Sequence, residues 1–188
     1  MFKQLSSVGL LVCICLVLFS SCKDDPNDLQ LNHDGANFNS PELPAATYES
    51  AAMFPSAFDG NDAGNELYAI EYYIDQIPAS AEINVYRGGT NEPDSLVFSA
   101  PVLTQITQDS WNVATVSPPI VLDGGNFWIS MRYSQTGTQR TLGCDAGPAV
   151  SNGDWLYDSQ DGSWIPLSDR STININWNLR AKVAIPEE

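Results

Sequence analysis

The clearest regularity along the chain is an alternation of apolar and polar residues with a period of two. It is longest near the C-terminal end, where polar residues separate six apolar ones: Ile173, Ile175, Trp177, Leu179, Ala181 and Val183. Successive side chains of a β-strand point to opposite faces, so this pattern predicts a strand over 173–183 with one buried face. Its asparagine, arginine and lysine side chains are then expected on the opposite face.

Shorter segments repeat the pattern, and turns that contain glycine separate them. Further strands are predicted at 68–75, 81–87, 96–100, 111–116 and 127–133. The turn at Asp161-Gly162 tolerates positive φ, so a hairpin that joins 155–157 to 164–165 is predicted. No stretch keeps a helical period over three turns. The sequence therefore predicts an all-β fold, an antiparallel β-sandwich or jelly roll.

The chain begins with features of an export signal. One basic residue, Lys3, precedes an apolar run over 8–19, which ends at two serines before Cys22. About a dozen residues are too few for the ~20 of a spanning helix, so the pattern predicts a secretory signal over 1–21. The stretch LFSSC resembles a bacterial lipoprotein box and predicts lipidation of Cys22. The alternative is an ordinary signal with an incidental cysteine.

Two further regions follow the signal. Residues 22–46 are rich in Asp, Asn and Pro, lack apolar periodicity and are predicted to form a flexible tether. Residues 47–188 are numerous enough for one domain with a core. The acidic start CKDD resembles the signal that sends some Gram-negative lipoproteins to the outer face of the outer membrane. We therefore expect an outer-membrane lipoprotein, exposed at the cell surface and touching the membrane only through its lipid.

The charge of the chain narrows the classes of partner. Asp and Glu number 23 against 8 Lys and Arg, which gives a formal net charge of −15. A surface this acidic repels phosphate backbones and argues against nucleic-acid binding. Neutral glycans, basic proteins and divalent cations remain compatible with it.

Cys144 is the candidate for nucleophilic chemistry, in the stretch GCDAGPAVSNGDW. The other three cysteines lie in the signal or at the lipidation site, so no intrachain disulfide partner is left for it. A nucleophilic cysteine needs a base, and the only histidine, His33, lies in the predicted tether. Cys144 is therefore expected to be a small, buried and unreactive residue.

Several motifs together resemble a known module. They are VYRGGT, SWNVATV, FWISMRY, GCDAGPAV followed by GDW, and NWNLRAKV, in this order between residues 85 and 183. The chain from about Thr47 to Val183 is similar to the jelly-roll adhesin or haemagglutinin domains of gingipain-type proteases and of related surface lipoproteins. This resemblance implies a fold like that of carbohydrate-binding modules, a non-catalytic role in adhesion and, in many members, structural calcium.

Calcium would draw on the acidic loops. The loop 58–66 begins like an oxygen-ligand loop, but Ala63 and Ile70 occupy positions that an EF-hand fills with ligands. A jelly-roll site collects oxygens from separate loops instead. The predicted donors are Asp59, Asp62, Asp145 and Asp154. The alternative is that these carboxylates form only a solvated surface.

The five tryptophans offer candidate sugar-stacking residues. Trp111 and Trp177 lie on apolar faces of predicted strands and are assigned to the core. Trp128 falls on the face opposite Phe127, and Trp164 follows an exposed turn. With Tyr157, Trp128 and Trp164 are the predicted ligand-binding residues. The alternative is that they cover the second face of a sheet or a loop.

The sequence supports three hypotheses of function. The first is a non-catalytic surface lipoprotein that binds a glycan or glycoprotein. The second is a structural or scaffolding subunit of a cell-surface assembly. The third is a glycoside hydrolase, which requires two carboxylates roughly 5–9.5 Å apart across a groove.

Overall fold

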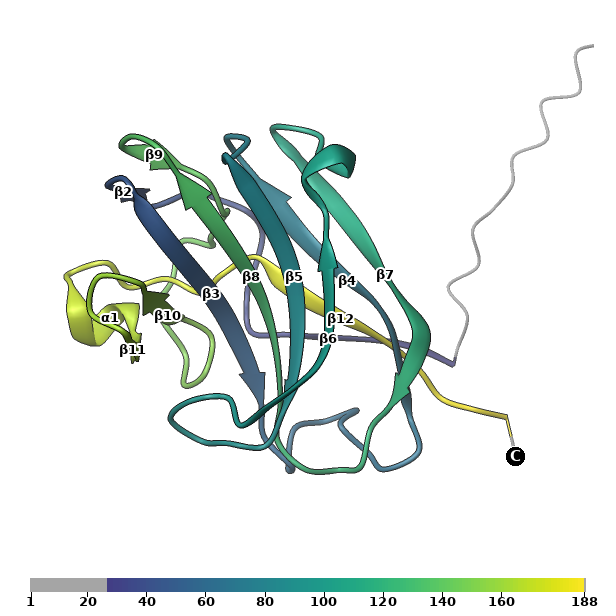
Figure 1. The fold of residues 1–188 in the computed structure, drawn as a ribbon. Coiled ribbons are helices and arrows are strands. Elements are labelled where there is room, and N and C mark those ends of the chain that lie inside the picture. Colours follow the sequence, from purple (N-terminus) through teal and green to yellow (C-terminus); the bar gives the residue numbers. More distant parts are fainter. Residues whose placement is uncertain (1–26, 188) are drawn as a thin grey trace, which may run out of the picture.

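The protein is a β-sandwich of two antiparallel sheets. Figure 1 shows it in a computed structural model, in which residues 27–187 are described. The four-stranded sheet has the order β1 (Asp28–Asn32), β12 (Leu179–Ala184), β4 (Glu66–Ile74) and β7 (Ser110–Val121). The six-stranded sheet has the order β11 (Ser163–Pro166), β10 (Trp155–Asp158), β3 (Ala46–Phe54), β8 (Phe127–Gln135), β5 (Ser80–Arg87) and β6 (Ser95–Pro101). The predicted all-β, sandwich class is confirmed.

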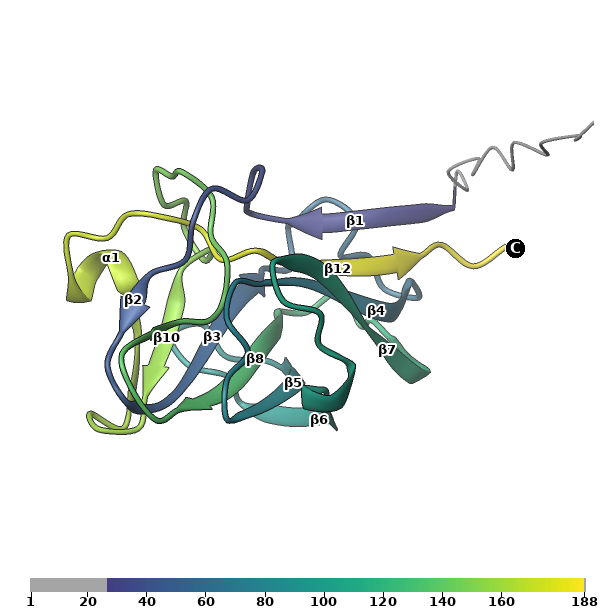
Figure 2. The same ribbon diagram turned by 90° about the horizontal axis from the view of Figure 1, so that it is seen from above.

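In Figure 2 the four-stranded sheet lies in the upper part of the view and the six-stranded sheet in the lower part, so the two sheets form separate layers. The chain crosses repeatedly between them, as in a jelly roll: β3 is in the larger sheet, β4 in the smaller and β5 in the larger again. Two short strands, β2 (Glu42–Leu43) and β9 (Gln139–Arg140), pair at the side. The helices are a 3-10 turn at Leu103–Gln105 and α1 (Leu167–Arg170). Within residues 27–187, neither is long and apolar enough to cross a membrane.

The core fills the space between the sheets. Alternate residues of the facing strands are buried there, including Phe54, Ile70, Ile83, Ile129, Met131, Tyr133 and Leu179, and Trp177 joins them from the segment before β12. Trp177 is thus a core residue, as predicted. Trp111 is not: it pairs in register with Tyr73 on the outer face of the four-stranded sheet, where the Arg180 guanidinium lies 4.0 Å from its ring centroid. Its ring also contacts that of Tyr73 edge to face, and it remains partly exposed.

The predicted strand over 173–183 is only partly correct. β12 begins at Leu179, and residues 173–178 lead into it from α1 with a single bridge between Trp177 and Cys144. Asn176 and Asn178 were expected on the exposed face, yet both are buried. Their amide side chains donate hydrogen bonds to buried carboxylates, Asn176 to Asp145 and Asn178 to Asp34. These bonds offset the cost of burying the amides, a cost that a period-two pattern does not reveal.

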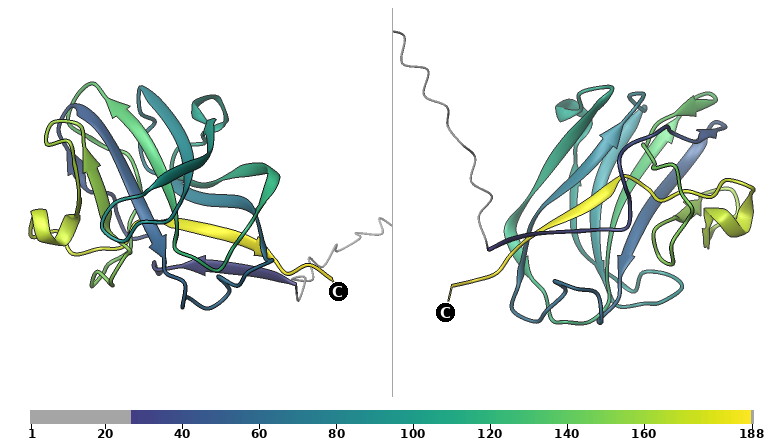
Figure 3. Two further views of the ribbon diagram at one scale, coloured as in Figure 1. Left: turned by 60° about the horizontal axis from the view of Figure 1, so that its bottom comes forward. Right: turned by 180° about the vertical axis from the view of Figure 1, so that it is seen from behind.

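The predicted flexible tether over 22–46 is also wrong for its described part. β1 pairs with β12 over Asp28–Asn32, and Figure 3 shows the two strands side by side. His33 stacks on Phe54 with 5.1 Å between ring centroids, and Asp34 is buried against Arg180. The polar residues that suggested a tether therefore have partners inside the fold. The predicted signal 1–21 and the predicted lipidation site Cys22 lie outside the described residues.

Candidate ligand-binding face

The candidate site lies on the face of the six-stranded sheet that points away from the core, called the outer face here. Residues that alternate with the core residues of β3, β8 and β5 point to it, because strand side chains alternate. The side chains on these three strands are Thr47, Glu49, Ala51, Met53, Trp128, Ser130, Arg132, Ser134, Ser80, Glu82, Asn84 and Tyr86. The β10–β11 hairpin adds Trp155, Tyr157 and Trp164.

Four aromatic residues gather at one side of the outer face. The centroid of Trp128 lies 5.3 Å from that of Trp155 and 6.0 Å from that of Trp164. Tyr157 and Trp164 are cross-strand partners with centroids 5.6 Å apart, and both remain partly exposed. Both side chains are thus accessible to a ligand, and their role in binding stays a prediction.

Trp128 does not have the exposure that its predicted role requires. Its side chain is 0% exposed, and its indole N–H donates to the carbonyl of Gly88 at 2.9 Å. Trp155 and Trp164 cover it from the following hairpin. Trp128 therefore forms the buried support beneath the exposed aromatic residues, so the alternative reading, that it covers the second sheet face, holds.

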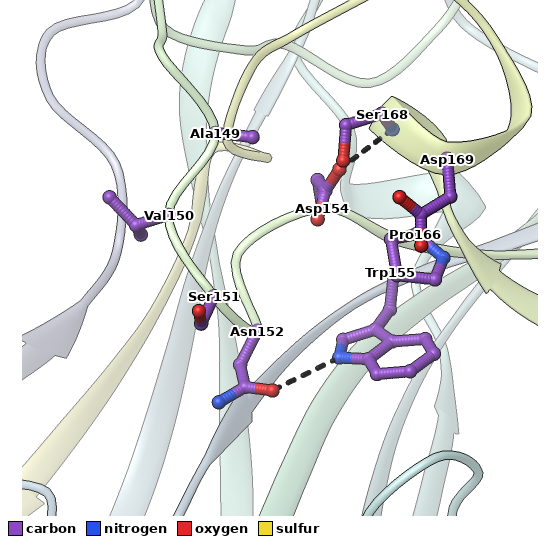
Figure 4. Close-up of a pocket in the computed structure, with 9 residues that line it drawn as sticks. All are labelled: Ala149, Val150, Ser151, Asn152, Asp154, Trp155, Pro166, Ser168 and Asp169. Atoms are coloured by element: carbon purple, nitrogen blue, oxygen red, sulfur yellow. Dashed lines mark hydrogen bonds between the residues drawn. The ribbon is translucent and has the colours of Figure 1, made fainter.

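A pocket of about 340 Å³ adjoins this aromatic group (Figure 4). Its walls combine the indole of Trp155 and the ring of Pro166 with carboxylates, hydroxyls and an amide. The lining residues are Ala149, Val150, Ser151, Asn152, Asp154, Trp155, Pro166, Ser168 and Asp169. Asp154 is buried and accepts the backbone N–H of Ser168 at 2.9 Å, which fixes the start of α1 against the pocket. The mixture of one aromatic surface with several acceptors suits a polyhydroxylated ring.

Asn176 holds the loop that forms one wall of this pocket. Its amide donates to Asp145 at 2.9 Å and to the carbonyl of Pro148 at 3.1 Å, and its side-chain oxygen accepts the N–H of Val150 at 2.8 Å. Gly153 passes so close that an added Cβ would lie 2.4 Å from that oxygen. The close approach explains the glycine in the GDW motif and gives the wall a fixed shape.

The four predicted calcium ligands do not form one site. Asp59 and Asp62 are exposed in their loop, whereas Asp145 and Asp154 are buried elsewhere. No group of three or more His, Cys, Asp or Glu side chains in the described part of the chain could hold a metal ion. Calcium binding stays a prediction, but these four side chains do not fit as its ligand set.

Asp145 has another role, which its hydrogen bonds define. Each of its oxygens accepts two hydrogen bonds, Oδ1 from the N–H groups of Gly147 and Asn176, and Oδ2 from the N–H of Gly35 and the Asn176 amide. Burial alone would raise the pKa of Asp145, but these donors outweigh it and lower the pKa below its usual value. Asp145 is therefore an acceptor that organises the surrounding loops.

Glu49 and its donors form a polar network in the middle of the outer face. Glu49 is 4% exposed, and its Oε1 accepts hydrogen bonds from Asn84 at 3.0 Å, Tyr86 at 2.7 Å and Ser130 at 2.5 Å. Burial and the adjacent Glu49 charge raise the pKa of Tyr86. Its hydroxyl therefore remains a donor at neutral pH. The network gives this part of the face one fixed arrangement.

Cys144 is buried, as predicted, with 3% of its surface exposed. Burial and the Asp145 charge raise the pKa of its thiol to about 11. His33 does not act as its base, because His33 Nε2 donates to the carbonyl of Met53 at 2.8 Å and its ring packs between Phe54 and Phe58. A neutral, enclosed thiol without a base is a poor nucleophile.

Sequence reasoning missed several residues of this face, notably Trp155, Glu49 and Arg132. A signal existed for Trp155, because it stands two positions before Tyr157 on one strand and so shares its face. No such signal existed for Glu49. Its strand β3 reads ATYESAAMF, in which small residues occur on both faces and hide the alternation.

Comparisons with known proteins support the fold. No family model and no curated protein matches the chain. Among the solved structures that match is a clostridial cysteine protease Cwp84 after propeptide cleavage, with a TM-score of 0.64 at 13% identity. Another contains the cysteine protease and lectin-like domains of Cwp84, a surface layer associated protein of Clostridium difficile, with a TM-score of 0.56 at 12% identity. Each match covers 87% of this chain but only 42% and 37% of those chains, so this chain spans less than half of their length. At this identity the likeness shows the β-sandwich alone.

Proposed function

We propose that this protein is a non-catalytic module of the cell surface that binds a glycan, free or on a glycoprotein, at the outer face of its six-stranded sheet. The observation that carries the proposal is the partly exposed pair Tyr157 and Trp164 beside the pocket lined by Trp155 and Asp154. A sugar ring has an apolar face that packs on an aromatic ring and hydroxyls that bond to carboxylates and amides. Both kinds of partner are present here.

The hairpin that carries the aromatic pair is fixed before any ligand binds. Arg170 Nη1 lies 2.7 Å from the Asp161 carboxylate and 3.4 Å from that of Asp158, which ties α1 to the hairpin turn. Trp128 supports the hairpin from below through contacts with Trp155 and Trp164. A rigid aromatic surface loses little conformational entropy on binding, which favours affinity for a flexible oligosaccharide.

The solved structures add support of a coarser kind. They belong to a surface layer associated protein with a lectin-like domain, and the similarity of this chain extends over that domain. A role as a surface module is consistent with this likeness. The gingipain-type adhesin relationship and the outer-membrane location remain proposals based on sequence motifs.

Anchoring through Cys22 belongs to the same proposal. Growth of the native host with labelled palmitate is expected to label the wild-type chain and to leave a Cys22→Ser variant unlabelled. Equal labelling of the two would contradict the lipoprotein hypothesis. Protease treatment of intact cells then tests exposure, because a surface protein is degraded without cell lysis.

The binding function is tested on a glycan array with the purified full chain. The single variants Trp164→Ala and Tyr157→Ala are expected to lower the signal of every bound glycan. Phe38→Ala is the matched control, since Phe38 is 71% exposed and lies outside the outer face. Binding without release of reducing ends separates a binding module from a glycoside hydrolase. An array on which wild type binds nothing, or on which the Phe38 variant loses as much as the other two, contradicts the proposal.

A further inference from the structure

A row of six side chains crosses the whole outer face in register. The pairings of neighbouring strands place these residues side by side, one from each strand in spatial order: Trp164, Tyr157, Glu49, Arg132, Glu82 and Pro101. Neighbouring strands lie about 4.8 Å apart, so roughly 10 Å separate Tyr157 from Arg132 two strands away. We call these six residues the cross-strand row. It is aromatic at one end and charged in its middle.

Arg132 differs from the other basic residues of the described chain in having no ion pair. The other five Arg and Lys side chains of residues 27–187 each lie within 4.0 Å of a carboxylate: Arg87, Arg140, Arg170, Arg180 and Lys182. Arg132 is exposed and makes no such ion pair with any described residue, although Glu49 and Glu82 are its direct neighbours in the row. Its guanidinium donors are therefore available to a ligand.

The neighbouring glutamates differ in what they can offer. The Oε1 of Glu49 is held by Ser130, Asn84 and Tyr86, which lie on the next rows toward Trp128. Glu82 is only half-buried, and no hydrogen bond to its carboxylate is found within the described ranges. A guanidinium and a free carboxylate thus stand next to each other without touching.

These two groups line a pocket of about 200 Å³. Its other walls carry small hydroxyls and apolar groups: Thr47, Ser80, Ala81, Pro101 and Ser134. The hydroxyls of Thr47 and Ser134 are hydrogen-bonded to each other at 2.8 Å. The charged groups of the pocket, Arg132 and Glu82, are therefore its main polar partners for a ligand.

We propose that Arg132 and Glu82 form a second sugar subsite, which binds neighbouring hydroxyl groups of a neutral oligosaccharide. The inference rests on the proposed function and extends it across the sheet. A hydroxyl both accepts and donates, so two adjacent hydroxyls accept from the guanidinium and donate to the carboxylate, filling the gap between them. With the aromatic pair roughly 10 Å away, the ligand is an oligosaccharide that spans both places rather than a single sugar.

Charge decides between a neutral and an anionic glycan. Arg132 alone would attract a carboxylate or sulfate, but it stands between two glutamates, and the chain carries a net charge of −15. An anionic group bound at Arg132 would lie beside Glu82 and meet its repulsion at short range, where salt screens little. Neutral hydroxyls avoid this cost.

The test measures affinity against ligand length and charge. The purified full chain is titrated calorimetrically with gluco-, manno- and galacto-oligosaccharides of one to six residues, and with oligogalacturonates of the same lengths. The variants are Arg132→Met and Glu82→Gln, and the control is Arg140→Met, an exposed arginine outside the outer face. We expect wild-type affinity for one neutral series to rise with length. Each of the two variants should lose about tenfold for the longer members, as for one charge-assisted hydrogen bond, while Arg140→Met binds like wild type.

The outcomes separate this inference from the function on which it rests. If Tyr157→Ala weakens binding while Arg132→Met and Glu82→Gln do not, the second subsite is overturned and the proposed function stands. If oligogalacturonates bind more tightly than neutral ligands and Arg132→Met abolishes this, the subsite is anionic and the inference is overturned. If wild type binds no member of the neutral series, the second subsite is overturned, and the glycan array decides the proposed function separately. Circular dichroism of each variant confirms that a lost signal does not come from unfolding.

Discussion

Asp34 and Arg180 join the two ends of the folded chain, 146 positions apart, through hydrogen bonds of 3.0 Å from Nε and 2.9 Å from Nη2 to the same carboxylate oxygen. Asp34 is 7% exposed and also accepts the Asn178 amide at 2.6 Å. The guanidinium in turn lies over Trp111. This contact fixes the segment after β1 to the start of β12, and so makes part of the predicted tether a structural element.

Replacing Asp34 by alanine is expected to destabilise the protein by about 3–5 kcal/mol, because it leaves the Arg180 charge partly buried and unpaired. Urea unfolding followed by circular dichroism measures the change. Glu42→Ala is the control, since the Glu42–Arg140 pair is exposed at 3.5 Å and should contribute no more than about 1 kcal/mol. Equal decreases in the free energy of unfolding in the two variants would show that the Asp34–Arg180 pair stabilises the protein no more than an exposed pair does.

His33 should make stability depend on pH in a mildly acidic range. Burial lowers its pKa from the ordinary value, while the Met53 carbonyl and Asp34 oppose this in part. The unfolded chain then binds a proton more readily than the folded one, so stability is fully present above about pH 6.5 and falls as the pH drops below it. Urea midpoints at pH 7.5 and 5.5 measure the effect. Because His33 is the only histidine, His33→Gln should flatten the difference, and an unchanged slope would refute this origin.

Cys144 should react slowly with alkylating agents in the native protein. Its thiol pKa of about 11 leaves very little thiolate at pH 8, and the side chain is enclosed. Iodoacetamide labelling, read by mass spectrometry of the peptide that contains Cys144, is expected to be slow in buffer and fast in concentrated urea. Comparable rates in both would mean an exposed, activated thiol and would reopen the question of catalysis.

Calcium remains a prediction from the sequence, and melting curves test it. A cation that binds only the folded state raises the melting temperature by mass action. We expect full-length protein to melt several degrees higher in calcium than in EDTA, with less effect from magnesium, which demands tighter geometry. Identical melting curves in all three solutions at matched ionic strength would contradict the prediction that the folded protein binds calcium.

Much of the fold could be predicted from the sequence, because most strands have one apolar and one polar face. β8 shows this directly, with Phe127, Ile129, Met131 and Tyr133 all in the core. β3 was not predicted because Ala51 and Ala52 are the same residue type but face opposite sides of the sheet, so the sequence shows no alternation there. The described part of residues 22–46 was misread because polarity indicates exposure only where a residue has no buried partner, and Asp34 has one.

The candidate site was only partly predictable for a related reason. Tyr157 and Trp164 follow from the hairpin, since the turn between them is local in sequence. The burial of Trp128 depends on that same hairpin folding over a strand nearly thirty positions away, a tertiary event that periodicity does not encode. The register that aligns Tyr157, Glu49 and Arg132 likewise depends on strand pairing across the sheet.

The central claim is that glycans bind at Trp164 and its neighbours, and the indole N–H resonances of a ¹⁵N-labelled chain report on it directly. The full chain is titrated with the neutral oligosaccharide series. The Trp164 resonance, assigned with Trp164→Phe, is expected to move and to saturate. That of Trp111, partly exposed on the opposite sheet, should stay in place. Movement of Trp111 without Trp164, or no movement of either at millimolar ligand, would contradict the account.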